Sequence, residues 1–178
     1  QLIVIFVEKV WLTLKIDEIM KLKVGETVNY SGELIVMRDA AQRKLRELIA
    51  GSKEIPVYLG GKIIFYAGPA KPPKNFKIGA IGPTTSERMD EFLEMLYYLG
   101  VIATIGKGKR SNLAVELCKK YQRVYFISPS GAAAYLSKCV VDAEIVAFNE
   151  LGPEAIYRIE VKDFPIMVAI DSLGNQIF

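Results

Sequence analysis

The first third of the chain combines short apolar runs with turn residues, a pattern that is typical of β-strands. These runs span residues 13–16, 24–28 and 31–36. After Arg38 the apolar residues recur at helical spacing, which predicts a helix that ends at Gly51. Two more apolar runs, at 56–59 and 62–66, flank the pair Gly60-Gly61, and this arrangement predicts a β-hairpin.

A linker with prolines at positions 69, 72 and 73 follows, and beyond it the pattern changes to repeated units of strand, polar turn and helix. The strands are expected at 77–81, 101–105 and 124–127, and the helices that follow them are expected to end near residues 99, 121 and 138. Such alternation predicts an α/β fold with parallel strand–helix units, in which the three polar turns face the same edge of the sheet. Further strands are expected at 143–148, 155–161 and 166–171.

Length and composition fit one globular domain, because the chain has 178 residues of which 51% are hydrophobic and 24% charged. The formal net charge of +3 is small and both signs are interleaved, so the sequence does not suggest nucleic-acid binding. The apolar run at 2–7 is too short to span a membrane and lacks the features of a secretory signal. We therefore expect an N-terminal extension at residues 1–11, a single domain at 12–178, a cytoplasmic location, and no nucleic-acid or membrane partner.

The side chains available for chemistry are limited. The chain has no histidine, which removes the commonest general base and the commonest metal ligand. Its two cysteines, Cys118 and Cys139, lack the close spacing of metal ligands and are expected to be buried thiols. The chain alone is therefore not expected to hold a metal cluster, and catalysis has to use Asp, Glu, Lys, Tyr, Ser or Thr, or residues of another chain.

The segment Gly82–Asp90, with the sequence GPTTSERMD, is the most distinctive motif. Thr84 and Glu87 have the spacing of a capping box, so one interpretation is a helix cap. The other is an anion site, because Arg88 adds a guanidinium to the hydroxyls of Thr84 and Thr85 at the start of a helix. The pattern alone leaves both interpretations open.

Two other basic positions follow apolar strands. Lys107 lies between glycines in Gly106–Arg110, where it is either a ligand-binding cation or part of a solvated basic turn. Arg38 closes the run 34–37, where it binds a ligand or pairs with Asp39 at the surface. The segment Ser128–Gly131 is better explained as a helix N-cap turn. Together these residues predict a basic, hydroxyl-lined pocket for a small multivalent anion.

The string Gly82–Asp90 resembles the Gly-Pro-Thr-Thr-x-x-Arg-Met signature of the β region of iron–sulfur-dependent class I fumarate hydratases and tartrate dehydratases. Further matches occur in the order found in that family, over residues 14–178. They are Tyr30-Ser31-Gly32, Arg38-Asp39-Ala40-Ala41, Tyr66-Ala67-Gly68-Pro69, Gly106-Lys107-Gly108, Ser130–Ala134, Leu151–Ile156 and Val161–Pro165.

The resemblance implies the β subunit of a hydro-lyase that hydrates fumarate reversibly to malate and has a swivelling β/β/α domain. A four-iron four-sulfur cluster would be carried by a cysteine-bearing α partner, within a hetero-oligomer, and none would be bound by this chain alone. Arg38, Thr84, Arg88 and Lys107 match the positions with which family members bind the dicarboxylate. Thr84 matches the position regarded as the base, and Thr85 would add a hydroxyl.

One departure from the family concerns Gln42, since many relatives have His there, and this puts any orienting role of that residue in doubt. The motifs do not separate fumarate from tartrate as substrate, so the β subunit of tartrate dehydratase is the alternative enzyme. A non-catalytic anion-binding or assembly domain is the alternative without catalysis.

Overall fold

The structure, a computed structural model, describes residues 15–74 and 78–178. Its elements in chain order are α1 (Ile16–Ile19), β1 (Thr27–Val36), α2 (Asp39–Ala50), β2 (Ile63–Phe65), η1 (Glu87–Met89), α3 (Asp90–Tyr98), β3 (Ala103–Gly106), α4 (Asn112–Tyr121), β4 (Val124–Ile127), α5 (Ala133–Lys138), β5 (Val140–Ala147), η2 (Asn149–Glu154) and β6 (Ile156–Ile170). The expected extension at 1–11 lies outside the described residues. So does the first half of the strand expected at 13–16, and its last residue, Ile16, begins α1 instead.

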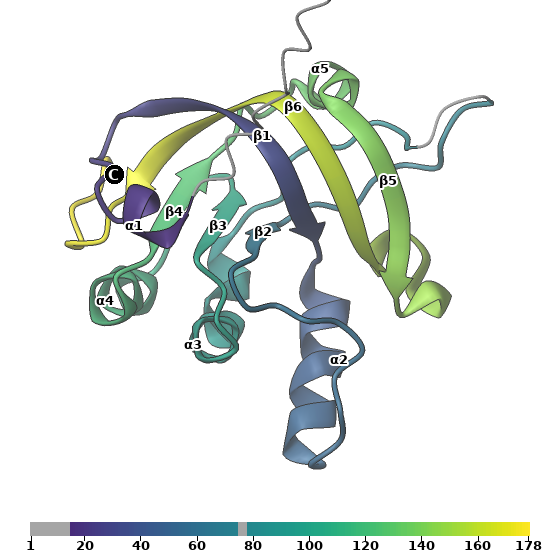
Figure 1. The fold of residues 1–178 in the computed structure, drawn as a ribbon, viewed down its shortest axis with the longest axis horizontal. Coiled ribbons are helices and arrows are strands. Elements are labelled where there is room, and N and C mark those ends of the chain that lie inside the picture. The colour runs from purple at the N-terminus through teal and green to yellow at the C-terminus, as the bar shows by residue number, and fades with distance from the viewer. Residues whose placement is uncertain (1–14, 75–77) are drawn as a thin grey trace, which may run out of the picture.

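All the strands belong to one mixed sheet with the order β1-β2-β3-β4-β6-β5. The strands β1 to β4 run parallel to one another, whereas β6 is antiparallel to both β1 and β4. Because β6 pairs with both of these strands, the sheet closes into a barrel-like form (Figure 1). The strand β4 pairs with the C-terminal part of β6, and β5 pairs with its N-terminal part. The expected α/β class with parallel strand–helix units is confirmed in this mixed form.

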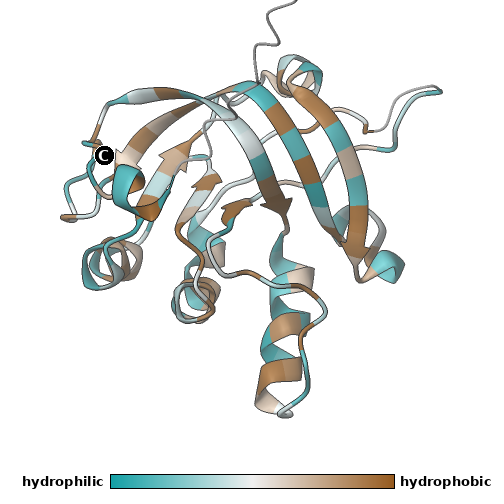
Figure 2. Cartoon of the chain, viewed as in Figure 1, coloured by the Kyte–Doolittle hydropathy of each residue, from teal (hydrophilic) through white to brown (hydrophobic). Residues whose placement is uncertain are grey.

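Successive side chains along a strand point to opposite faces of the sheet, and each face packs into its own apolar core. In β1, Leu34 and Val36 join one core, and Ile35 between them joins the other. The second core also contains Leu45 of α2 and Leu93 of α3, which lie with α4 on the same side of the sheet (Figure 1). Hydrophobic and hydrophilic positions alternate along β5 and β6 in Figure 2, as the two-residue period of a strand requires.

Several expected elements merge or differ in extent. The end of the run at 24–28 joins the run at 31–36 in the single strand β1, whereas residues 24–26 precede the strand; an irregularity lies between Tyr30 and Gly32, where the glycine adopts a φ of +152°. The runs at 155–161 and 166–171 likewise form β6, which continues through Pro165.

Two expectations were wrong. The hairpin at Gly60-Gly61 does not form, because β2 is paired on one edge with β1 and on the other with β3, which leaves no edge for residues 56–59. The described part of the strand expected at 77–81 is also not a strand. Its backbone instead contacts the proline linker, where the amide of Ala70 donates to the carbonyl of Ala80 over 2.9 Å.

The helices agree closely with expectation. The helix after Arg38 ends at Ala50, although the residue with positive φ is Ser52 rather than Gly51. In the described part of the chain, no helix is long and apolar enough to cross a membrane.

Candidate functional site

Three polar turns meet where the parallel strands end. The segment after Gly82 forms a short ladder with the turn after β3: the Lys107 amide donates to the Thr84 carbonyl over 3.3 Å, and the Ser86 amide donates to the Lys107 carbonyl over 3.1 Å. The third turn follows β4, and the Ser128 amide donates to the Gly106 carbonyl over 3.0 Å. The prediction that these turns share one edge is therefore confirmed.

A hydrogen-bonded cluster joins the beginning of α2 to the motif at 82–90. Arg88 donates from Nη2 to the Thr84 Oγ1 over 2.8 Å and from Nε to the Asp39 Oδ1 over 2.7 Å. Both distances are short, as is usual when one partner is charged. The Arg88 side chain remains 42% exposed, so the remaining face of its guanidinium is open to a ligand.

The capping-box interpretation of Thr84 and Glu87 is wrong. The residue that precedes η1 is Ser86, and no side chain provides a cap hydrogen bond there. Thr84 instead uses its hydroxyl oxygen to accept from Arg88. The expected N-cap at 128–131 is also wrong, because α5 begins after Ala132 without a side-chain cap.

Arg38 lies at the junction of β1 and α2, beside the same cluster. Its Nε is 3.9 Å from the Asp39 Oδ2 and 3.6 Å from the Glu154 Oε1, and it has no hydrogen bond to the described residues. The side chain packs against Gly68, where an added Cβ would lie 3.0 Å from the Arg38 Cδ and 3.1 Å from Nη1. Asp39 thus faces two guanidinium groups, a role that the sequence indicated only as a surface pair with Arg38.

Lys107 and Thr85 lie next to each other across the ladder between the turns. Thr85 is exposed and Lys107 is half-buried. Within residues 15–74 and 78–178, the Lys107 ammonium forms no ion pair and its side chain no hydrogen bond, and so it can neutralise an incoming anion. All five predicted site residues therefore lie on the same edge or at the adjoining start of α2.

Gln42, at the position where many relatives have His, is fully buried. Its Nε2 lies 3.1 Å from the Met89 Sδ, and its Oε1 has no hydrogen-bond partner among the described residues. This side chain therefore packs beneath the motif and cannot reach a ligand at the surface without a rearrangement.

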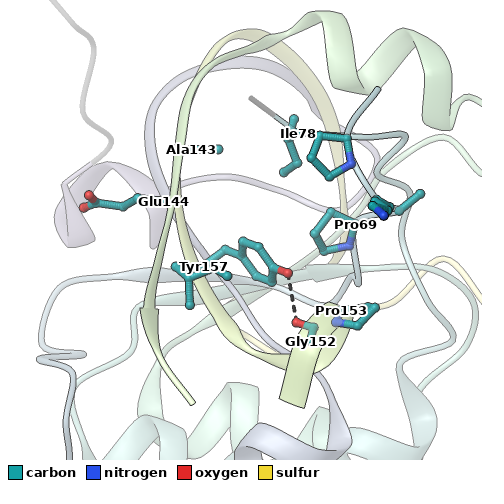
Figure 3. Close-up of a pocket in the computed structure, with 11 residues that line it drawn as sticks. Pro69, Ile78, Ala143, Glu144, Gly152, Pro153 and Tyr157 are labelled. Carbon is teal, nitrogen blue, oxygen red and sulfur yellow. Dashed lines mark hydrogen bonds between the residues drawn. The ribbon is translucent and has the colours of Figure 1, made fainter. Parts of the chain in front are cut away.

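In the described part of the chain, a cavity of about 480 Å³ is lined by Lys107, Ser128 and Met167, among others. Another, of about 500 Å³, is lined by none of the predicted site residues. Figure 3 shows its Tyr157, whose hydroxyl donates over 2.9 Å to the carbonyl of Gly152, close to Pro153.

A buried polar network beneath the turns was missed by the sequence reasoning. Arg110 is only 1% exposed and forms an ion pair with Asp90, which is 5% exposed. Burial alone would lower the pKa of Arg110, but the neighbouring Tyr66 and Asp90 raise it above its ordinary value. The only sequence signal was a charged residue placed directly after the Gly-Lys-Gly-Lys turn, where it reads as one more solvated cation.

The cysteines do not fit a metal cluster held by this chain. Burial raises the pKa of Cys118 to about 11, and burial together with Asp163 raises the pKa of Cys139, so both stay protonated at neutral pH. Thiolates, not thiols, bind metals. Among the residues that the structure describes, no group of three or more His, Cys, Asp or Glu side chains is placed to hold a metal ion.

Comparison with known proteins gives one consistent result. A family model described as "Fumarase C-terminus" matches residues 6–178. The chain is 41% identical over 157 residues to the anaerobic class I fumarate hydratase of Escherichia coli K12, which covers 87% of this chain and 29% of that enzyme. It is 38% identical over 164 residues to fumarate hydratase 2 of Leishmania major, which covers 91% of this chain and 29% of the relative.

A third relative is a separate subunit. The chain is 36% identical over 169 residues to the β subunit of L(+)-tartrate dehydratase of Escherichia coli K12, covering 92% of this chain and 83% of that subunit. The chain thus spans less than a third of the fumarate hydratases that it matches, but most of the tartrate dehydratase β subunit. Because the family model covers nearly the whole chain, the protein belongs to the Fumarase C-terminus family and is homologous to class I fumarate hydratases and to the tartrate dehydratase β subunit.

Proposed function

We propose that this chain is the β-type part of an iron–sulfur hydro-lyase that adds water reversibly to fumarate to give malate. It would contribute dicarboxylate-binding cations and a proton-transferring threonine to a site completed by another chain or region. The observation that carries this proposal is the hydrogen bond of 2.8 Å from Arg88 to the Thr84 Oγ1, at an edge that also carries Arg38 and Lys107.

The cations suit a doubly charged substrate. Arg88 is fixed by Asp39 but keeps donors free, and a planar guanidinium can bind a carboxylate with two hydrogen bonds. Lys107 adds a point charge on the other side of the ladder. Removing a proton next to a carboxylate pushes negative charge into that group, so a cation fixed at that carboxylate stabilises the transition state more than the ground state, whereas a cation at the other carboxylate stabilises both alike.

Thr84 is the proposed proton-transferring residue. In the dehydration direction its Oγ1 takes the proton from the carbon next to a carboxylate, and in the hydration direction it returns that proton. A free threonine hydroxyl is a very weak acid, so the alkoxide form needs stabilisation. Arg88 supplies a positive charge and a donated hydrogen bond to Oγ1, and both favour the anionic form.

The cluster belongs to the partner in this proposal, because Cys118 and Cys139 do not fit one. We propose a cysteine-bearing α subunit or α-type region, a hetero-oligomer or its fused equivalent, and a cytoplasmic location. The domain at 12–178 would be of the swivelling β/β/α kind, with residues 1–11 as an extension.

We expect that the isolated chain binds no iron–sulfur cluster and has negligible hydro-lyase activity, since two buried thiols in separate cores cannot supply the ligands. The measurement is anaerobic reconstitution with iron and sulfide, followed by absorbance and a fumarate hydration assay. The complete enzyme treated in the same way is the positive control. Cluster absorbance and turnover from this chain alone would refute the assignment of the cluster to a partner.

In the complete enzyme, Arg88→Ala is expected to lower kcat/KM at least about tenfold, because a charge-assisted contact to a bound anion contributes roughly 1.5–3 kcal/mol. Arg88→Lys should recover only part, since it loses the planar fork. Arg46→Ala is the matched control: Arg46 is 46% exposed and pairs with Glu91 over 2.8 Å, away from the three turns. An unchanged kcat/KM for Arg88→Ala would remove Arg88 from the site.

The second candidate is dehydration of tartrate, favoured by the match to 83% of the tartrate dehydratase β subunit, against 29% of the fumarate hydratases, although the identity is lower. In this candidate the same residues bind tartrate, a dicarboxylate that carries one more hydroxyl than malate. Assaying the complete enzyme with fumarate, malate and L(+)-tartrate separates the two, and higher kcat/KM for tartrate would select the second. A complete enzyme that turns over none of them would support the remaining alternative, a non-catalytic anion-binding or assembly domain.

A further inference from the structure

A buried tyrosine lies directly under the turn that carries Lys107. Tyr125 of β4 is fully buried, and its hydroxyl lies 3.0 Å from the Ser86 Oγ and 3.0 Å from the Gly108 carbonyl oxygen. Ser86 is also fully buried, and its Oγ accepts from the Lys107 amide over 3.2 Å. Neither Ser86 nor Tyr125 has a role in the site as it is proposed above.

Proton counting orders these contacts into one chain. Tyr125 has a single hydroxyl proton, and a carbonyl can only accept. The Lys107 amide proton is shared between the Thr84 carbonyl at 3.3 Å and the Ser86 Oγ at 3.2 Å; the Ser86 hydroxyl is then free to donate to Tyr125, whose own proton goes to the carbonyl of Gly108. The chain therefore starts and ends on the same turn, and it ties that turn to the residue two positions after Thr84.

The surroundings hold this chain in place. The Arg110 guanidinium lies over the Tyr125 ring at 4.7 Å and over the Tyr66 ring at 5.4 Å, and its partner Asp90 fixes it in turn. Burial, against the opposing effect of the hydrogen bond to Ser86, raises the pKa of Tyr125 to about 12, so that its hydroxyl stays a donor. There is no spare room, since a Cβ added to Gly106 would overlap the Ser86 Oγ.

We propose that Tyr125 is a positioning residue which, through the Ser86 hydroxyl, fixes Lys107 relative to Thr84. This inference rests on the proposed function, in which Lys107 binds a substrate carboxylate. Without this chain, the Lys107 turn keeps its two backbone bonds to Thr84 and Ser86 but loses its side-chain support, so the lysine can shift relative to the substrate while Thr84, held by Arg88 and by the Tyr66 carbonyl, keeps its place.

In the complete enzyme, Tyr125→Phe is expected to raise KM about tenfold with a much smaller change in kcat. The reason is that we place Lys107, across the ladder from Thr84 and Arg88, on the carboxylate that takes up no charge in the reaction, so its loss weakens binding of ground state and transition state alike. Ser86→Ala breaks the same chain at its other hydroxyl and should reproduce the effect. Tyr97→Phe is the matched control, because Tyr97 is also buried and, among the described residues, its hydroxyl is hydrogen-bonded to the Cys118 sulfur at 3.4 Å and to nothing in the Lys107 turn.

A double-mutant cycle with Lys107→Ala separates positioning from a general loss of packing. Once Lys107 is Ala, Tyr125→Phe should raise KM no further, whereas additive effects on KM would overturn the inference. Amide hydrogen exchange of Lys107 gives a readout that does not depend on activity. We expect faster exchange in Tyr125→Phe and not in Tyr97→Phe, and equal exchange in both would also overturn it.

The same cycle distinguishes this inference from the proposed function. If Lys107→Ala alone leaves kcat/KM unchanged, Lys107 does not bind the substrate, and that part of the proposed function fails. The exchange experiment then still decides whether Tyr125 fixes the turn. If Lys107→Ala raises KM and Tyr125→Phe does not, the proposed function stands and the positioning role of Tyr125 is refuted.

Discussion

Thr84→Val in the complete enzyme is expected to lower kcat by two or more orders of magnitude, within the range that loss of a general base produces. Valine keeps the size of the side chain but has no oxygen to exchange a proton. The melting temperature should change little, because the Thr84 hydroxyl caps no helix and its hydrogen-bond partner, Arg88, is half-exposed. The measurement is steady-state kinetics in both directions together with a thermal melt.

Thr84→Ser is the matched control for this prediction. It keeps the hydroxyl that accepts from Arg88, so it should retain most of the activity. A Thr84→Val enzyme that turns over at close to the wild-type rate would show that the base lies elsewhere, and the partner chain would then be the place to look for it.

The second large effect concerns stability. Asp90→Ala leaves the buried Arg110 without its counter-charge, and it also removes the acceptor for the Ser111 amide at 2.8 Å and for the Ser111 hydroxyl at 2.6 Å. Removing one partner of a buried ion pair costs about 3–5 kcal/mol. Urea unfolding of the purified protein measures this loss.

Glu94→Ala tests whether burial is the cause. Glu94 lies one turn further along α3 and pairs with Lys120 over 2.7 Å, but both side chains are more than half exposed. Exposed ion pairs contribute little to stability, so this variant should unfold at nearly the wild-type urea concentration. If Asp90→Ala and Glu94→Ala lowered the free energy of unfolding by equally small amounts, the buried network beneath the turns would not be what stabilises the fold.

The helices and the central strands could be predicted because their signals are local. The helical spacing of apolar residues after Arg38 gave α2, and the short apolar runs before the polar turns gave β3 and β4. The common edge for Thr84 and Lys107 was predicted from parallel strands, but residues 78–83 form no strand that leads into Thr84; its backbone bonds to Tyr66 and Lys107 place it there instead.

Other features depend on which strand edges are open, and this is not local information. The apolar run at 78–81 has the composition of a strand, but both edges of β2 are already taken by β1 and β3. Ile78 and Ile81 are nonetheless buried, so their apolar character serves packing instead of a ladder. The hairpin expected at Gly60-Gly61 failed for the same reason.

The candidate site shows the same division. Arg88 and Lys107 could be named as candidates from the sequence, because a cation beside hydroxyls or glycines after an apolar run suits an anion, although a helix cap and a solvated turn fitted equally well. The hydrogen bond from Arg88 to Thr84 could not be predicted, since the spacing of the motif also fits a capping box. Asp39, which comes from the start of α2, binds the Arg88 Nε and so orients the guanidinium toward Thr84. Tyr125 reads as an ordinary residue of an apolar strand until its hydroxyl is seen to reach Ser86.

The most direct test of the proposed function is a structure of the complete enzyme with a dicarboxylate substrate bound. We expect the guanidinium of Arg88 and the ammonium of Lys107 within about 2.7–3.2 Å of substrate carboxylate oxygens, as hydrogen bonds require. The Thr84 Oγ1 should lie about 3–3.5 Å from the carbon that exchanges the proton. A substrate held wholly by the partner chain, with Thr84 out of reach of that carbon, would contradict the assignment of this chain as the source of the binding cations and the base.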